Sequence, residues 1–202
     1  MSPDLMLAFM GFAVVNSITP GPNNMMLMTS GVNFGFRRTM PHLAGVNLGF
    51  MLMMLLVGLG MGQIFARFPI VYTSMKVLGA LYLLWLAWKI ARSGPIEDGE
   101  AAGHPMTFLQ AAAFQWVNPK AWAMVIGAIA AFTEPSAYVT SVLAITALYL
   151  IGGTPSSVVW VVFGTAMRRL LRHPRQVIWF NRAMALLLVL SLWPIVSDLI
   201  PR

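Results

Sequence analysis

Two short polar segments interrupt long apolar stretches of this chain, and their residue types suit the binding of a small charged molecule. The first break reads Thr19-Pro20-Gly21-Pro22-Asn23-Asn24, and the second break reads Asn118-Pro119-Lys120. Proline and glycine end a helix, which leaves backbone N–H and carbonyl groups without partners at the two new helix ends. These ends carry opposite partial charges. With asparagine amides and a lysine ammonium group nearby, they suit a zwitterionic amino acid.

A transporter site is the functional interpretation of the two breaks. Interrupted apolar segments in comparable positions of two halves of a chain are typical of transporter binding sites. A polar break at membrane depth is tolerated only where protein buries it or where it lines a water-filled cavity. In the simpler alternative, the prolines only kink their helices and the lysine side chain reaches the membrane surface. We expect the substrate site to be formed by Thr19, Pro20, Gly21, Pro22, Asn23, Asn24, Asn118, Pro119 and Lys120.

The composition indicates a membrane protein. The chain has 202 residues, of which 58% are hydrophobic and only 9% are charged, and its mean hydropathy is +0.76. Soluble domains carry roughly 25% charged residues, so this chain cannot cover its surface with polar groups in water. It has no cysteine, which excludes disulfides and thiolate-bound metals. We expect no metal and no cofactor.

Hydropathy predicts an all-α integral membrane protein with six membrane-spanning helices, each near the roughly 20 residues that a bilayer requires. The predicted spans are 4–28, 41–65, 69–91, 108–132, 138–164 and 178–200. A polar cytoplasmic linker, residues 92–107, ends at a capping box of Thr107 and Gln110 that opens the fourth span. The alternative is a chain of five spans, in which one broken segment fails to cross.

The linker divides the chain into two units of three spans, residues 1–91 and 108–202. An odd number of spans places the second unit upside down relative to the first. This arrangement predicts an inverted 3+3 repeat, with the broken first and fourth spans meeting near the midplane. The sequence supports the repeat only in part, because Gly45 and Gly49 in the second span have no clear partner at the same offset.

Small residues in the second and fifth spans predict close packing or a hinge. Gly45 and Gly49 permit two helices to approach closely, either within the chain or in a homodimer. Gly152, Gly153 and Pro155 weaken the fifth span. They are candidates for a hinge in a transport cycle, and a simple proline kink is the alternative.

The basic residues predict which ends of the spans face the cytoplasm. The loops after the first, third and fifth spans hold eight lysine and arginine residues, whereas the opposite side holds only Arg67 and Arg202. Cytoplasmic loops are enriched in these residues, so both termini are expected on the outer side. The start of the chain lacks a basic n-region, so the first span is expected to be retained. The net charge of +7 is mainly an orientation signal, and no nucleic-acid partner is expected.

Five stretches along the chain carry a resemblance to a known family. They are Ile18 to Asn24, Gly35 to Arg38, Leu43 to Gly45 with Gly49, Leu78 to Lys89, and Asn118 to Lys120. In content and order they resemble the lysine exporter (LysE/RhtB) superfamily of bacterial amino-acid exporters, over nearly the whole chain. The double asparagine and the run from Trp85 to Ala91 are most similar to the cysteine/O-acetylserine exporter branch.

The resemblance implies a secondary active transporter of the bacterial inner membrane that exports amino acids or close derivatives by proton antiport. Many family members carry aspartate after Pro-Gly-Pro, where this chain has Asn23. A neutral amide carries neither a proton nor a full charge, so lysine and arginine are disfavoured as substrates. Small neutral substrates such as cysteine, O-acetylserine, threonine or homoserine are favoured, and the proton carrier stays unassigned.

A channel and an intramembrane enzyme are the alternatives to a carrier. Broken helices also line pores, and saturable counterflow distinguishes a carrier from a channel. An intramembrane hydrolase needs paired aspartates, a His-Glu-x-x-His motif or a serine with a base, and the sequence shows none of these. His42 is a candidate proton relay, with an ordinary interfacial histidine as the simpler interpretation. We expect no enzymatic activity.

Overall fold

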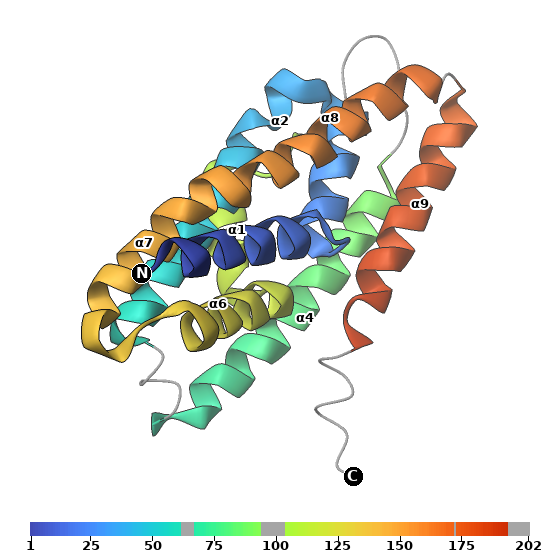
Figure 1. Cartoon of the computed structure of the whole chain (residues 1–202). Helices are drawn as coiled ribbons and strands as arrows, with labels where there is room; N and C mark the ends of the chain where they lie inside the picture. Colours follow the sequence, from blue (N-terminus) through green and yellow to red (C-terminus); the bar gives the residue numbers. More distant parts are fainter. Residues whose placement is uncertain (62–66, 94–103, 172, 194–202) are drawn as a thin grey trace.

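The computed structural model describes residues 1–61, 67–93, 104–171 and 173–193, and the regular elements of these residues are all helical (Figure 1). They are α1 (Pro3–Ile18), α2 (Pro22–Leu56), the π-helix η1 (Val57–Met61), α4 (Pro69–Ala91), α5 (Phe108–Phe114), the 3₁₀ helix η2 (Gln115–Val117), α6 (Pro119–Phe132), the 3₁₀ helix η3 (Pro135–Ala137), α7 (Tyr138–Gly152), α8 (Thr154–Leu170) and α9 (Pro174–Leu190). The all-α prediction is confirmed for the described part of the chain.

The label α2 covers two helices that meet at a sharp turn. Gly35 has φ 76° and ψ 173°, a backbone conformation that side chains disfavour. The hydroxyl group of Thr39 donates to that of Ser30 at 3.3 Å, although the two residues are nine positions apart. In a straight helix, nine residues span about 13 Å, so the chain must fold back at Gly35. The loop predicted between the first two spans, residues 29–40, is therefore helical on both sides of one glycine.

Both predicted helix breaks are present. The backbone of Thr19 and of Gly21 is extended between α1 and α2, and that of Asn118 is extended between η2 and α6. A proline occupies the first turn of α2 and of α6, where its missing N–H costs no hydrogen bond. The predicted capping box is also confirmed, because Thr107 N donates to Gln110 Oε1 at 3.0 Å and Gln110 N donates to Thr107 Oγ1 at 3.3 Å.

Glycines let α5 lie directly on the second part of α2. A Cβ atom on Gly49 would lie 2.5 Å from the Cα of Ala112, and one on Gly45 would overlap the main chain of Phe108. Real Cβ atoms do not approach other atoms so closely, so only glycine permits this contact. The predicted close packing thus occurs within the chain.

The predicted fifth span consists of two helices, α7 and α8, separated at Gly153. A Cβ atom on Gly152 would lie 3.2 Å from the Cβ of Ala13 in α1, and one on Gly153 would overlap the ring of Tyr149. Pro155 lies in the first turn of α8. These residues bring α1 close to α7, and their role as a hinge stays a prediction.

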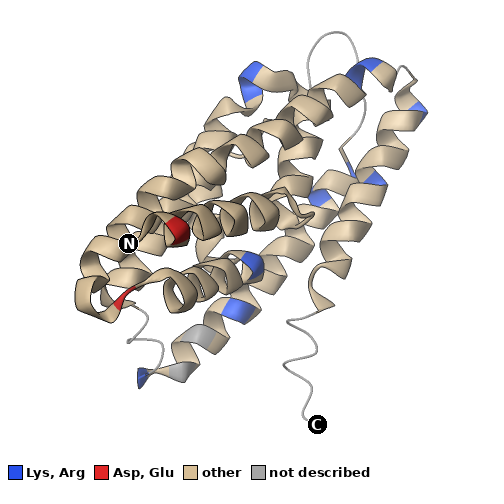
Figure 2. Ribbon diagram, in the orientation of Figure 1, with Lys and Arg blue, Asp and Glu red and all other residues tan. Residues whose placement is uncertain are grey.

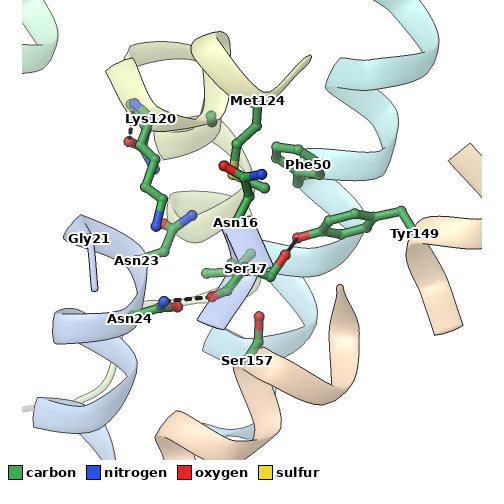
Figure 3. A pocket seen from close by; sticks show the side chains of 13 residues that line it. Asn16, Ser17, Gly21, Asn23, Asn24, Phe50, Lys120, Met124, Tyr149 and Ser157 are labelled. Carbon is green, nitrogen blue, oxygen red and sulfur yellow. Dashed lines mark hydrogen bonds between the residues drawn. The ribbon is translucent and has the colours of Figure 1, made fainter. Parts of the chain in front are cut away.

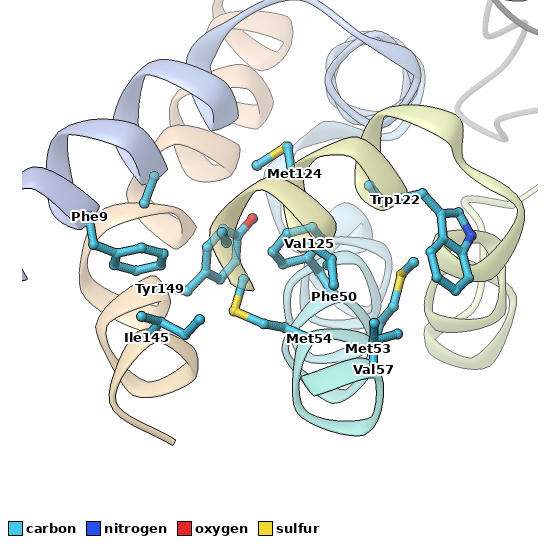
Figure 4. Close-up of a cluster of buried hydrophobic side chains, with 13 residues drawn as sticks. Phe9, Phe50, Met53, Met54, Val57, Trp122, Met124, Val125, Ile145 and Tyr149 are labelled. Atoms are coloured by element: carbon cyan, nitrogen blue, oxygen red, sulfur yellow. The ribbon is translucent and has the colours of Figure 1, made fainter. Parts of the chain in front are cut away.

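The main apolar cluster joins α1, the second part of α2, α6 and α7 (Figure 4). Its buried members are Phe9, Ala13, Phe50, Met53, Met54, Val57, Ala121, Trp122, Met124, Val125, Ala128, Ile145 and Tyr149. Phe50 and Tyr149 lie with their ring centroids 4.4 Å apart. This cluster fixes α1 and α6, the two helices that flank the breaks, against the longer helices of the bundle.

The outer surface of the bundle is rich in exposed apolar side chains such as Leu7, Leu109 and Leu170. In water, apolar patches on this scale mark an interaction surface or a membrane contact. Three helical stretches of the described residues are long and apolar enough to cross a membrane, namely Pro22–Met61, Thr73–Ala91 and Pro135–Leu170. The shorter apolar helices α1 and α6 lie next to the breaks. The structure thus supports a helical membrane protein, and the count of six crossings stays a prediction.

Candidate functional site

The two breaks face each other, and Lys120 joins them (Figure 3). Its ammonium group donates to the carbonyl oxygen of Thr19 and lies 3.5 Å from that of Pro20. These carbonyls follow the C-terminal end of α1, where a helix carries partial negative charge. The lysine is half-buried and points across to the first break.

Other helices also bind the carbonyl groups at the end of α1. The amide nitrogen of Asn24 donates to Ser17 O at 2.7 Å and to Thr19 O at 2.9 Å. The indole N–H of Trp160, on α8, donates to Ile18 O at 3.2 Å. The last carbonyl groups of a helix have no partner within the helix, so these donors satisfy them. Asn24 is therefore a structural cap of α1 as well as a residue of the cavity.

A reciprocal amide pair joins the first break to the helical turn before the second. Asn23 Nδ2 donates to Gln115 Oε1 at 2.8 Å, and Gln115 Nε2 donates to Asn23 Oδ1 at 3.2 Å. Gln115 Nε2 also donates to Ala111 O at 2.9 Å, and the side chain is fully buried. The sequence analysis did not single out Gln115. A glutamine three residues before Asn118, inside an apolar segment, was the available signal.

The N-terminal ends of α2 and α6 open towards the same region. Gly21 is the N-cap of α2, so no side chain caps the N–H groups of the first turn. The N-cap of α6 is Asn118, whose Oδ1 accepts from the backbone N–H of Lys120 at 3.1 Å. A Cβ atom on Gly21 would lie 2.7 Å from the Cδ of Lys120, so glycine is what allows the lysine stem to pass. An uncapped helix N-terminus is a favourable place for an anionic group.

A small cavity of about 30 Å³ lies between the breaks. Its polar lining consists of Asn16, Ser17, Asn23, Asn24, Asn118, Lys120, Tyr149 and Ser157, with Gly21, Val46, Phe50, Ala121 and Met124 completing it. Such a volume holds about two water molecules, so the cavity must widen to take an amino acid. No aspartate or glutamate occurs in this lining, which is drawn from the described residues.

The expected site residues divide into two groups in the structure. One group lines the cavity, namely Gly21, Asn23, Asn24, Asn118 and Lys120. Thr19 and Pro20 contribute carbonyl oxygens to Lys120, whereas Pro22 and Pro119 begin helices and are not among the lining residues.

Several lining residues were not predicted. Ser17 and Tyr149 contact each other across the cavity, with Ser17 Oγ donating to the phenol oxygen at 3.4 Å. Ser157 Oγ donates to Asn47 Oδ1 at 3.2 Å and lies on α8. Ser17 precedes the first break by two residues, which was a usable signal. Tyr149 and Ser157 reach the cavity only through the packing of α7 and α8, which the sequence does not reveal.

Charged side chains are unevenly distributed over the bundle (Figure 2). Most lysine and arginine residues gather at the end where α2 turns and where α8 meets α9, whereas the two described acidic residues, Asp4 and Glu134, lie towards the opposite end. Glu134 pairs there with the N-terminal amine at 3.3 Å. The cationic Lys120 lines the cavity between the breaks.

Comparison with known proteins gives one consistent result. The family model described as LysE type translocator matches residues 14–196. Proteins named cysteine/O-acetylserine efflux protein from Escherichia coli K12, Escherichia coli O9:H4 and Shigella sonnei are each 36% identical to the chain over 191 residues, which cover 94% of this chain and 96% of each relative. No solved structure matches the chain.

Proposed function

Because the chain belongs to the LysE type translocator family, we propose that it exports small neutral amino acids or close derivatives across the bacterial inner membrane. Cysteine and O-acetylserine are the first candidates, since they appear in the names of the relatives, and threonine and homoserine follow. The observation that carries the proposal is the polar cavity between the two facing breaks, with one ammonium group, several amides and no carboxylate in its described lining.

The cavity provides partners for both charges of an amino acid. A substrate carboxylate would bind the ammonium group of Lys120 and the uncapped N-terminus of α2, both favourable for an anion. A substrate ammonium group would bind the amide oxygens of Asn23 and Asn118 and the carbonyl oxygens at the end of α1. A second positive charge, as in lysine or arginine, would face Lys120 without a carboxylate to offset it. This arrangement favours neutral side chains.

Transport requires the cavity to open alternately to each side of the membrane. In the proposed cycle a substrate carboxylate displaces the carbonyls of Thr19 and Pro20 from Lys120 and so releases the contact between the two breaks. The proposed hinge lies where α7 ends and α8 begins, and consists of Gly152, Gly153 and Pro155. Export against a gradient needs an energy source, and we propose exchange with protons for this role.

Six crossings in an inverted 3+3 repeat are the proposed topology, with residues 1–91 and 108–202 as the two units. One correspondence between the units supports it. α1 packs on α7 beside Gly152, and α5, its counterpart after the linker, packs on α2 beside Gly45 and Gly49. The clustering of lysine and arginine at one end of the bundle supports a cytoplasmic position for that end and an outer position for both termini (Figure 2).

An efflux panel tests the proposal. Cells that express the chain are loaded with dipeptides, and the medium is assayed for individual amino acids. Wild-type protein should raise external cysteine, O-acetylserine, threonine or homoserine above the level of an empty vector. Lys120→Met keeps the length of the side chain and removes its charge, so it should lower export about tenfold, the loss of one charge-assisted hydrogen bond. Gly11→Ala, at a position with open space around it, is the matched control and should export normally.

The outcomes separate the parts of the proposal. No release of any amino acid above the empty vector rejects amino-acid export. Normal export by Lys120→Met rejects the site. In proteoliposomes, flux that does not saturate indicates a channel, and export that ignores an imposed pH gradient rejects proton exchange.

A further inference from the structure

A second and larger cavity, of about 90 Å³, lies between the two parts of α2, the C-terminal half of α4 and residues 104–110. It is distinct from the cavity at the breaks and shares no lining residue with it. It lies towards the end of the bundle where most lysine and arginine residues gather, because Lys89 in the last turn of α4 lines it. Under the proposed topology this is the cytoplasmic end.

Two buried polar side chains in this cavity have no partner in the structure. His42 is 1% exposed, and neither of its ring nitrogens makes a hydrogen bond; the hydroxyl oxygen of Thr29 is in the same situation. Both residues line the cavity. Buried polar groups are almost always paired, so an unpaired imidazole and an unpaired hydroxyl that share a cavity indicate that something polar occupies it.

The part of the lining that belongs to α4 offers a positive charge and aromatic rings. Lys89 is exposed, and its ammonium group lies 5.4 Å from the centre of the Trp85 ring. The amide of Gln110 and the ring of Tyr82 also line the cavity. No aspartate or glutamate occurs among the described lining residues. The cavity therefore combines an anion-binding group at its edge with acceptor atoms in its interior.

We propose that this cavity is a second, cytoplasmic binding site for the zwitterionic amino acid, where cargo binds before it reaches the breaks. The carboxylate binds Lys89 and the amide N–H of Gln110. The ammonium group donates to an unprotonated nitrogen of His42 and to the hydroxyl oxygen of Thr29, beside the face of an aromatic ring. The assignment rests on the proposed function for the identity of the cargo, and on the unpaired groups for the existence of the site.

Equilibrium binding to the purified full chain tests the second site. The probes are radiolabelled L-cysteine and L-threonine, with cysteamine, which lacks the carboxylate of cysteine, as a third. Wild-type protein should bind two amino-acid molecules per chain. Lys89→Gln should weaken one of the two sites about fivefold, the usual loss for an exposed charge pair, and should leave cysteamine binding unchanged. His42→Leu should lower the stoichiometry to one.

Arg92→Gln is the matched control. Arg92 also ends α4 and lies 4.5 Å from the ring of Trp88, yet it does not line the cavity. Its replacement should leave both sites unchanged. Any of three results would overturn the second site. They are binding of one amino acid per chain in the wild type, no saturable binding of either amino acid, and equal effects of Lys89→Gln and Arg92→Gln. If the efflux panel shows no export while two amino acids still bind per chain, export is rejected and the second site is retained.

Discussion

Replacing Asn23 with alanine should destabilise the protein as well as stop export, because it leaves Gln115 buried without its partner. Gln115 is fully buried, and Asn23 supplies both its hydrogen-bond donor and one of its two acceptors. An unsatisfied buried polar group costs about 1–3 kcal/mol. Asn23 borders the cavity, so a water molecule can replace part of the loss, and we expect a net cost of about 2 kcal/mol.

The assay is thermal unfolding of the purified protein in detergent at one fixed scan rate. For a chain of this size, 1 kcal/mol corresponds to roughly 2–4 °C in Tm, so Asn23→Ala should unfold about 6 °C below the wild type. Asn16→Ala is the matched control, because Asn16 lines the same cavity but donates only within its own helix, to Phe12 O at 2.9 Å. It should unfold within about 2 °C of the wild type.

A double variant isolates the contact between the two amides. Gln115→Leu removes the buried amide itself. The double variant should therefore lose less free energy of unfolding than the two single variants lose together, by about 1 kcal/mol or more. Strictly additive losses, or an Asn23→Ala protein as stable as the Asn16→Ala control, would show that the pair does not hold the breaks together.

Two further predictions concern glycines. Gly49→Ala should unfold about 6 °C below Gly11→Ala. Both changes gain the same helix propensity, but only Gly49→Ala forces α2 and α5 apart, which costs about 1–3 kcal/mol of stability. Equal melting temperatures of the two variants would contradict the close contact. Gly35→Ala should also lower the Tm, since its φ of 76° costs a side chain about 1–3 kcal/mol; a variant as stable as the wild type would show that α2 does not turn there.

The parts of this fold that depend on neighbouring residues in the sequence were predictable, and the parts that depend on tertiary packing were not. Both breaks and the capping box of Thr107 and Gln110 follow from local backbone chemistry, and all are present. A turn between residues 29 and 40 was predicted, but its position at Gly35 within a helical segment was not. Gly31, four residues earlier, stays helical and packs closely on the main chain of α8 at Val161, and only the fold distinguishes the two glycines.

The same division applies to the site. Asn23, Asn24 and Lys120 stood out because they are polar residues inside apolar segments, and they line one cavity. The contact of Lys120 with the carbonyls of the first break was not predicted, since it requires the two units to be placed relative to each other. Tyr149 lies at an unremarkable position of an apolar helix, and only the packing of α7 against α1 brings it to the cavity.

If Lys120 binds the substrate carboxylate as proposed, its contact with the end of α1 makes the carbonyls there competitors of the substrate. A carboxylate must displace two backbone carbonyls before it can bind, so the apparent affinity falls by the fraction of molecules in which the lysine is released. For an exporter, such low affinity is useful. An exporter of low affinity removes an excess of the amino acid without depleting its working concentration in the cytoplasm. Release outside is also faster, because the protein's own carbonyls replace the departing carboxylate.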